Sequence, residues 1–119
     1  MGEIRVFETG ATRDTDLSKP DYRGFISPSA LIRFGQYMTE HRKQSDGKLR
    51  ASDNWKKGIP PTEYCSSFLR HSVSAWHIFE EAEYDLRLLA GSKEWQDLLC
   101  AIYFNVQGLL HETMKLTEE

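Results

Sequence analysis

The chain has 119 residues, of which 39% are hydrophobic and 28% are charged, and its formal net charge at pH 7 is −3. These values are typical of a soluble globular protein, and the length allows one hydrophobic core, so we expect a single domain over residues 1–119. The acidic balance argues against a nucleic acid polymer as a general partner. No apolar run approaches the roughly 20 residues of a membrane span, and the N-terminus does not resemble a signal peptide. We therefore expect a cytoplasmic protein with no membrane partner.

The first 26 residues are rich in turn-forming residues and show neither helical nor strand periodicity, except that Ile4 to Phe7 could form a short strand. We expect residues 1–26 to form an irregular arm. A first helix should begin at Ser27 and Pro28, because serine caps helix N-termini and proline suits the first helical position. Leu31, Phe34, Met38 and His41 recur on one face of this helix.

Residues 42–60 form a long polar loop that carries six of the fifteen Lys and Arg residues. Connections of this length without structure of their own are uncommon in compact domains and are often functional. Trp55 lies in the most polar part of this loop, between an acid–amide pair and two lysines. Two interpretations of Trp55 are open: it covers a hydrophobic core, or it belongs to a binding loop in which aromatic, amide and ammonium groups contact one ligand. The basic cluster could meet a small anion or could simply be solvated.

Two longer helices are predicted in the second half of the chain. The first should start after Pro60 and Pro61 and run to Leu86, and the second should follow a break at Gly91 with Ser92 as its cap. The apolar stripe of the first comprises Cys65, Phe68, Leu69, Val73, Trp76 and Phe79, and that of the second comprises Leu98, Leu99, Ile102, Val106 and Leu109. The fold class is therefore all-α, a helical bundle. Three helices leave wide apolar faces, so we expect a homo-oligomer, a dimer or larger, to complete the bundle.

Four acidic residues lie near the junction of these two helices. Glu80 and Glu83 are three residues apart, and Glu94 and Asp97 repeat this spacing, so we expect both pairs to point partly inward. Unpaired carboxylates are costly to desolvate, and negative groups cannot compensate one another. Mg²⁺ or Mn²⁺ could compensate them, because both ions prefer oxygen ligands and keep positions for water and phosphate. Alternatively, the acids oppose a helix dipole or form a solvated helix end.

Five segments carry a resemblance to a known family: TGATRD, KPDY, SDNWKKG, FLRHSV and DLLCAIYFN. Their order and approximate spacing resemble the phage and bacterial dATP/dGTP diphosphohydrolase N-terminal domain family, which belongs to the MazG-like all-α nucleotide pyrophosphohydrolases. The resemblance extends from Thr9 to His111 and is most specific in the N-W-x-K-G and R-H elements. It implies an oligomer of MazG-like fold that cleaves a purine deoxynucleoside triphosphate to the monophosphate and pyrophosphate. Leu98 departs from the family, whose members often carry histidine after the aspartate aligned with Asp97.

The resemblance also implies a set of substrate-binding residues, namely Asn54, Trp55, Lys57, Arg70, His71 and Asn105. Trp55 would either stack on the base or seal the 42–60 loop, the binding loop, onto the bundle. Lys57 would meet phosphate, and with Arg70 it would stabilise the departing pyrophosphate. Arg70 and His71 would contact phosphate or brace the loop, although a hydrogen-bonded interhelical histidine is the simpler interpretation of His71. The amide of Asn105 would orient a ligand or read a purine edge.

The mechanism that follows is metal-assisted hydrolysis. Glu80, Glu83, Glu94 and Asp97 would hold Mg²⁺ or Mn²⁺, and a metal-bound water would attack the α-phosphorus. Glu80 or Glu81 would take the proton from that water as general base. An alternative function is a helical oligomer that binds nucleotides without cleaving them and so sequesters a signalling nucleotide. A purely structural bundle is the third interpretation.

Overall fold

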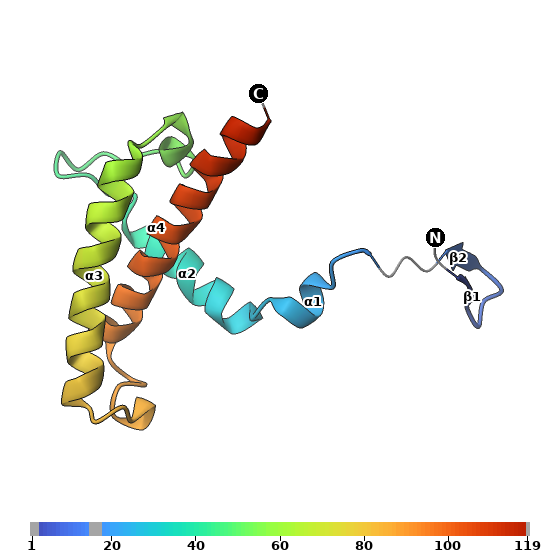
Figure 1. Ribbon diagram of the computed structural model, residues 1–119, viewed down its shortest axis with the longest axis horizontal. Coiled ribbons are helices and arrows are strands. Elements are labelled where there is room, and N and C mark those ends of the chain that lie inside the picture. The colour runs from blue at the N-terminus through green and yellow to red at the C-terminus, as the bar shows by residue number, and fades with distance from the viewer. Residues whose placement is uncertain (1–2, 15–17, 119) are drawn as a thin grey trace. The chain divides into compact units, whose positions relative to one another are not determined.

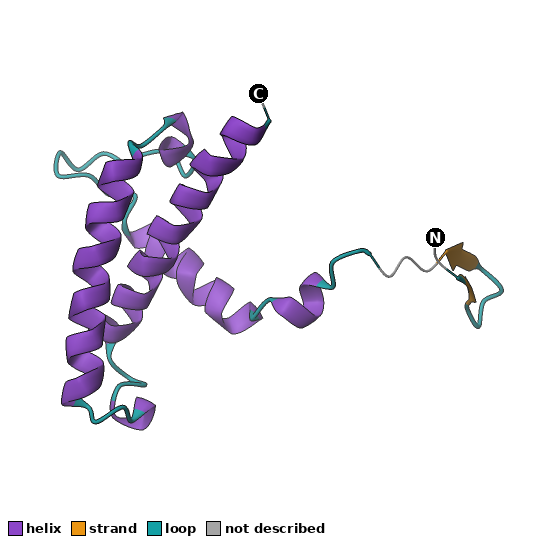
Figure 2. Cartoon of the chain, in the orientation of Figure 1, coloured by secondary structure: helices purple, strands orange, loops and turns teal. Residues whose placement is uncertain are grey.

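The computed structural model of the chain describes residues 3–14 and 18–118. The chain divides into two compact units, Met1–Leu31 and Ile32–Glu119. Most of the described residues are helical, and with one small two-stranded sheet they give an all-α fold (Figure 2). None of the helices in the described part of the chain is long and apolar enough to cross a membrane.

The first unit contains a β-hairpin and a short helix. Strand β1, Ile4–Val6, pairs antiparallel with β2, Thr12–Asp14. Gly10 closes the turn between them in a left-handed conformation, with φ 88°, and its N–H donates to the Phe7 carbonyl at 2.9 Å. Helix α1 spans Tyr22–Phe25. The prediction of an irregular arm is therefore wrong for these elements, although the expected strand near Ile4 is present.

Helix α2 spans Pro28–Glu40. Its predicted start is confirmed, because the Ser27 Oγ atom accepts a hydrogen bond from the Ala30 N–H at 3.2 Å. Within the second unit, Phe34 and Met38 are half-buried on this helix, whereas His41, predicted on the same face, follows the end of the helix and is exposed. The α2 face is therefore only partly covered.

Two long helices, α3 (Pro61–Glu81) and α4 (Lys93–Thr117), lie side by side and form most of the second unit (Figure 1). Both predicted starts are confirmed: Pro61 occupies the first turn of α3, and the Ser92 Oγ atom accepts from the Trp95 N–H at 3.1 Å. Between them lies a short 3₁₀ helix, Leu86–Leu88.

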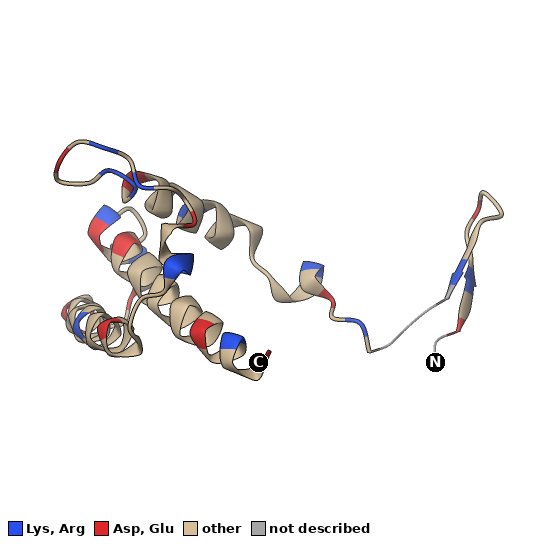
Figure 3. Ribbon diagram, turned by 90° about the horizontal axis from the view of Figure 1, so that it is seen from above, with Lys and Arg blue, Asp and Glu red and all other residues tan. Residues whose placement is uncertain are grey.

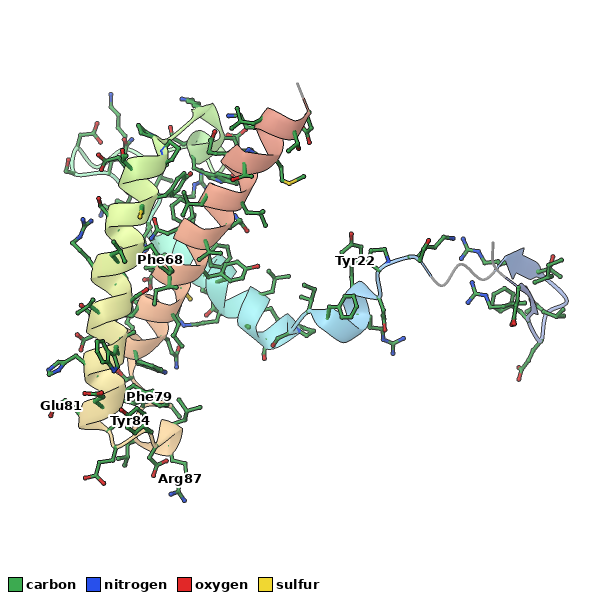
Figure 4. The ribbon with its side chains drawn as sticks, in the orientation of Figure 1. Tyr22, Phe68, Phe79, Glu81, Tyr84 and Arg87 are labelled. Atoms are coloured by element: carbon green, nitrogen blue, oxygen red, sulfur yellow. The ribbon has the colours of Figure 1, made fainter. Side chains whose placement is uncertain are left out.

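Helix α3 ends at Glu81, five residues before its predicted end. The cause is a turn in which Glu83 and Tyr84 have positive φ values of 53° and 60°. Left-handed residues cannot continue a right-handed helix. Tyr84 instead folds back, and its ring centroid lies 5.1 Å from that of Phe79 (Figure 4). On its other side, Phe79 stacks on Trp95, with centroids 5.5 Å apart, so aromatic contacts close this end of the helix pair.

The faces that α3 and α4 bury against each other differ from the predicted ones. Several residues of the predicted α3 stripe are exposed: Cys65, Leu69 (55%), Val73 (59%) and Trp76 (63%). The residues of α3 that are buried instead are Tyr64 and Ala75. On α4, the buried residues include Ala101, Asn105 and Gly108, a stripe of small residues. The two helices approach closely there, because a Cβ atom on Gly108 would overlap the Tyr64 ring.

Apolar side chains remain exposed on the outward faces of both α3 and α4, away from the contact between the two helices. On α3 they are Leu69, Val73 and Trp76, and on α4 five residues at helical spacing share this property: Leu99, Tyr103, Val106, Leu110 and Met114. Tyr103 also meets the Phe34 ring of α2, with centroids 4.6 Å apart. Rows of exposed apolar side chains are typical of an interaction site. That a second copy of the chain covers either row stays a prediction.

Candidate functional site

The 42–60 loop has more local structure than its composition suggests. Lys43 and Leu49 form an antiparallel bridge, and the Arg50 N–H donates to the Arg42 carbonyl at 2.8 Å. The chain therefore reverses, and Arg42 and Arg50 lie opposite each other at the base of this small hairpin. Figure 3 shows the Lys and Arg positions along it. A 3₁₀ helix, Asn54–Lys57, follows.

Trp55 attaches this loop to α4. Its partly buried ring meets His111 edge to face, with centroids 4.7 Å apart, and it approaches Phe104 at 6.2 Å. The Lys56 Nζ atom lies 5.7 Å from the centroid of the Trp55 ring. These contacts are the ones expected if Trp55 seals the loop onto the bundle. Stacking of Trp55 on a base stays a prediction.

A cavity of about 340 Å³ lies beside Trp55, and we call it the Trp55 cavity. Its lining combines residues of α2, the 42–60 loop, α3 and α4, all within the second unit. Four of the six predicted substrate-binding residues line it: Asn54, Trp55, His71 and Asn105. The other two, Lys57 and Arg70, are exposed and do not line it. The fold thus brings together most of a set that is spread over 52 positions of the sequence from Asn54 to Asn105.

The charge of the cavity lining is one-sided. Arg42, Arg50, His41 and His71 line it, and among the described residues no Asp or Glu does. The Arg42 Nε atom donates to the Arg50 carbonyl at 2.9 Å, which holds this guanidinium at the base of the hairpin. The cavity therefore suits an anionic ligand. The cluster of basic residues in the 42–60 loop was the sequence signal for anion binding, but the sequence analysis did not identify Arg42 and Arg50 individually.

Tyr37 on α2 and His41, just beyond the end of α2, form an aromatic part of the cavity wall. The Tyr37 and His41 rings lie 4.0 Å apart by their centroids, and the His41 Nδ1 atom lies 2.8 Å from the Tyr37 carbonyl oxygen. Burial raises the pKa of the Tyr37 hydroxyl, and the negative charge of Asp97 raises it further. Tyr37 therefore stays a neutral phenol at physiological pH. Sequence analysis missed both Tyr37 and the role of His41 in this wall.

Asn105 connects α3 and α4 at the cavity. It is only 5% exposed. Its Nδ2 atom donates to the Ala101 carbonyl at 2.8 Å and to the Ser67 Oγ atom at 3.2 Å. Both Ser67 and Ala101 also line the Trp55 cavity. A buried amide with satisfied donors is held in one orientation, which suits it to recognise a ligand group.

The negative charge of Asp97 is compensated by two cationic side chains of the same chain. Its Oδ1 atom accepts from the Arg33 Nη2 atom at 2.6 Å, and its Oδ2 atom accepts from the Lys93 Nζ atom at 2.7 Å. Lys93 also reaches the Glu40 Oε2 atom at 3.0 Å. The hydrogen bond from Lys93, followed by that from Arg33, lowers the pKa of the Asp97 carboxyl. The premise that this carboxylate lacks a compensating charge is therefore wrong.

The other predicted ligands do not join Asp97. Glu80 is exposed and accepts from the Trp76 Nε1 atom at 2.9 Å and from the Tyr84 hydroxyl at 3.0 Å. Glu83 lies in the turn beyond α3, so it does not share a helix face with Glu80, and Glu94 is exposed. The expectation that these carboxylates point inward is wrong for all three.

The predicted general base Glu81 points away from the helix pair (Figure 4), and its Oε1 atom lies 3.9 Å from the His77 Nε2 atom. Over residues 3–14 and 18–118, no three His, Cys, Asp or Glu side chains are grouped so as to hold a metal ion. The described acidic residues therefore do not form a Mg²⁺ or Mn²⁺ site by themselves in this arrangement, and metal binding stays a prediction.

Comparison with known proteins identified no relative of this chain. No family model matches the chain, and neither a curated protein nor a solved structure matches it. The family resemblance therefore rests on the five sequence segments alone.

Proposed function

We propose that this chain binds a purine nucleotide in the Trp55 cavity and that binding itself needs no metal ion. The observation that carries the proposal is the cavity lining, which combines two arginines and two histidines with aromatic rings and a buried amide. Each of these groups suits one part of a nucleotide.

The base would contact the aromatic part of the lining. Trp55 and Phe104 both line the cavity, and stacking of a base on an aromatic ring contributes roughly 1–3 kcal/mol. A cavity of 340 Å³ is at the lower end of the range for small-molecule sites, about 300–1,000 Å³. Such a volume suits a base and its sugar, with phosphates at the rim.

The phosphates would meet Arg42 and Arg50. Guanidinium groups form paired hydrogen bonds with phosphate oxygens, and they remain charged at all physiological pH values. Arg50 is exposed, so its side chain is available at the rim without loss of a core contact. Because these cations offset part of the phosphate charge, we expect the affinity to depend only weakly on Mg²⁺.

A second candidate function is hydrolysis of purine deoxynucleoside triphosphates to monophosphate and pyrophosphate, as the family resemblance implies. One observation favours it: Glu80, Glu83 and Glu94 are exposed close to the junction of α3 and α4. A second copy that docked at this end of the helix pair would bring further carboxylates beside them. Such an assembly would complete a metal-ligand set that the described residues of one chain do not form.

Calorimetric titration with dATP tests the primary proposal, once with EDTA and once with MgCl₂. We expect saturable binding with similar affinity in both. No binding under either condition would refute the proposal, and binding only with Mg²⁺ would favour the metal-dependent enzyme. Release of pyrophosphate from dATP or dGTP with Mg²⁺ or Mn²⁺ tests the second candidate separately.

A further inference from the structure

The orientation of the Asn105 amide is fixed by its neighbours. The Ala101 carbonyl oxygen is an acceptor only, so the atom that faces it at 2.8 Å must be the donating nitrogen Nδ2. The same nitrogen also reaches the Ser67 Oγ atom at 3.2 Å. Both hydrogens of the amide are therefore committed to the protein, one toward α4 and one toward α3.

The Oδ1 atom of Asn105 is in a different situation. It accepts no hydrogen bond from any residue that the structure describes. In the described part of the chain, two unpaired side-chain atoms are fully hidden from solvent, the Tyr64 hydroxyl and Glu112 Oε1, and Asn105 Oδ1 is not one of them. Asn105 is 5% exposed and lines the Trp55 cavity. Its small accessible part therefore includes an oxygen that is open to the cavity.

We infer that Asn105 presents only a hydrogen-bond acceptor to the Trp55 cavity and thereby selects adenine nucleotides over hypoxanthine nucleotides. This inference rests on the nucleotide-binding function proposed above. The 6-amino group of adenine donates, and so it satisfies Oδ1. Hypoxanthine carries a carbonyl oxygen at the same ring position, and two acceptors that face each other in a desolvated site leave both unpaired.

The geometry around the amide prevents an adaptive flip. In many sites an asparagine can exchange its oxygen and nitrogen to suit either ligand. Here a flip would place Oδ1 against the Ala101 carbonyl oxygen and would leave two acceptors in contact. Ser67 supports the orientation but does not determine it, because the Ala101 contact remains without the serine hydroxyl. Asn105 is thus a specificity-determining residue and Ser67 a positioning residue.

Three ligands test this inference on the unmodified protein: dATP, dITP and the triphosphate of unsubstituted purine deoxyriboside. dITP replaces the 6-amino group by oxygen but gains a hydrogen on N1. The unsubstituted purine has hydrogen in place of the 6-amino group and adds no donor on N1 or at position 2, so it isolates the loss of the 6-amino donor. With EDTA present, we expect both analogues to bind at least about tenfold more weakly than dATP.

Two variants assign the preference to Asn105. Asn105→Leu removes the acceptor at similar volume, and the ratio of dITP to dATP dissociation constants should fall to within about twofold of one. Ser67→Ala should keep most of the preference. If Asn105→Leu does not fold, the wild-type comparison of the three ligands still tests whether the predicted preference exists. Equal affinities for all three ligands, with saturable dATP binding, would overturn the inference and leave nucleotide binding intact, whereas failure of all three to bind would overturn both.

Discussion

The Arg33 Nη2 atom lies 2.6 Å from the Asp97 Oδ1 atom, and this ion pair joins α2 to α4. Lys93 holds the other carboxylate oxygen at 2.7 Å, so both oxygens of Asp97 have a cationic partner. Tyr37 and Met38, which follow Arg33 on α2, line the Trp55 cavity. Asp97 therefore helps to position one wall of the cavity, which is a structural role quite unlike that of a metal ligand.

Replacement of Asp97 by asparagine distinguishes these two roles. If Asp97 anchors α2, Asp97→Asn should lower the free energy of unfolding by about 1 kcal/mol, since it weakens two partly exposed ion pairs. Chemical denaturation measures the change. Glu94→Gln, an exposed site one turn earlier on α4, is the matched control and should change stability by less than about 0.5 kcal/mol. If Asp97 belongs to an uncompensated acidic cluster, the variant would be as stable as the wild type or more so.

The ion pairs of Asp97 also predict how stability depends on pH. Its pKa is lowered from the ordinary value of 3.8 in the folded state, mainly by the hydrogen bond from Lys93. A lowered folded pKa means that this stabilisation is complete above the unfolded pKa, about pH 5 and higher, and is lost as pH falls through 3.8 and below. Asp85, whose pKa is lowered by Arg87, adds a similar loss. The difference in melting temperature between wild type and Asp97→Asn should therefore shrink as pH falls from 6 toward 3, and a constant difference would contradict the assignment.

The contact between Gly108 and Tyr64 predicts a large effect of a small substitution. Alanine favours helices over glycine by about 1 kcal/mol, but a Cβ atom at position 108 would overlap the buried Tyr64 ring. Gly108→Ala should therefore destabilise the protein by about 1–3 kcal/mol through overpacking. Gly35→Ala is the matched control, because nothing lies within 4 Å of a Cβ atom at that α2 position. It should stabilise, and equal effects of the two substitutions would show that α3 and α4 do not pack this closely.

The left-handed turn beyond α3 predicts the opposite response at Glu83. Glycine adopts the observed φ of 53° without the steric cost that other residues carry, about 1–2 kcal/mol, so Glu83→Gly should leave stability unchanged or raise it. Ser74→Gly, at an exposed position inside α3, should cost about 0.5–1 kcal/mol. Thermal unfolding of both variants tests this. Destabilisation of similar size at both positions would mean that α3 continues past Glu83, as its sequence pattern predicts.

The helix starts could be predicted from the sequence because their signals are local. Serine at positions 27 and 92 and proline at position 61 act through their own backbone and neighbouring N–H groups. The end of α3 could not be predicted, because its left-handed residues are Glu83 and Tyr84 rather than glycine. Such a turn depends on tertiary contacts, here the packing of Tyr84 on Phe79.

The face of α3 that packs on α4 was mispredicted for a related reason. Leu69, Val73 and Trp76 have helical spacing and large apolar side chains, but periodicity does not reveal which of two stripes meets a neighbour. The contact uses small residues such as Ala75 and Gly108, which hydrophobicity alone underrates.

For the candidate site, motif resemblance identified Asn54, Trp55, His71 and Asn105, which the fold brings to one cavity. The arginines of that cavity depended on the hairpin of the 42–60 loop, whose turn at Asp46 and Gly47 is a hairpin signal that the sequence analysis did not use. The expected metal ligands do not assemble, because Lys93 and Arg33 compensate Asp97 and the left-handed turn takes Glu83 off the helix face of Glu80.

The most direct test of nucleotide binding in the Trp55 cavity is the dissociation constant of dATP for wild type, Arg50→Gln and Lys48→Gln. Both variants remove one positive charge from the same exposed hairpin, but only Arg50 lines the cavity. Calorimetry with EDTA should give saturable wild-type binding that is weakened about tenfold or more by Arg50→Gln and less than about twofold by Lys48→Gln, with unchanged melting temperatures. Absence of saturable binding to the wild type, or equal weakening in the two variants, would contradict the proposed site.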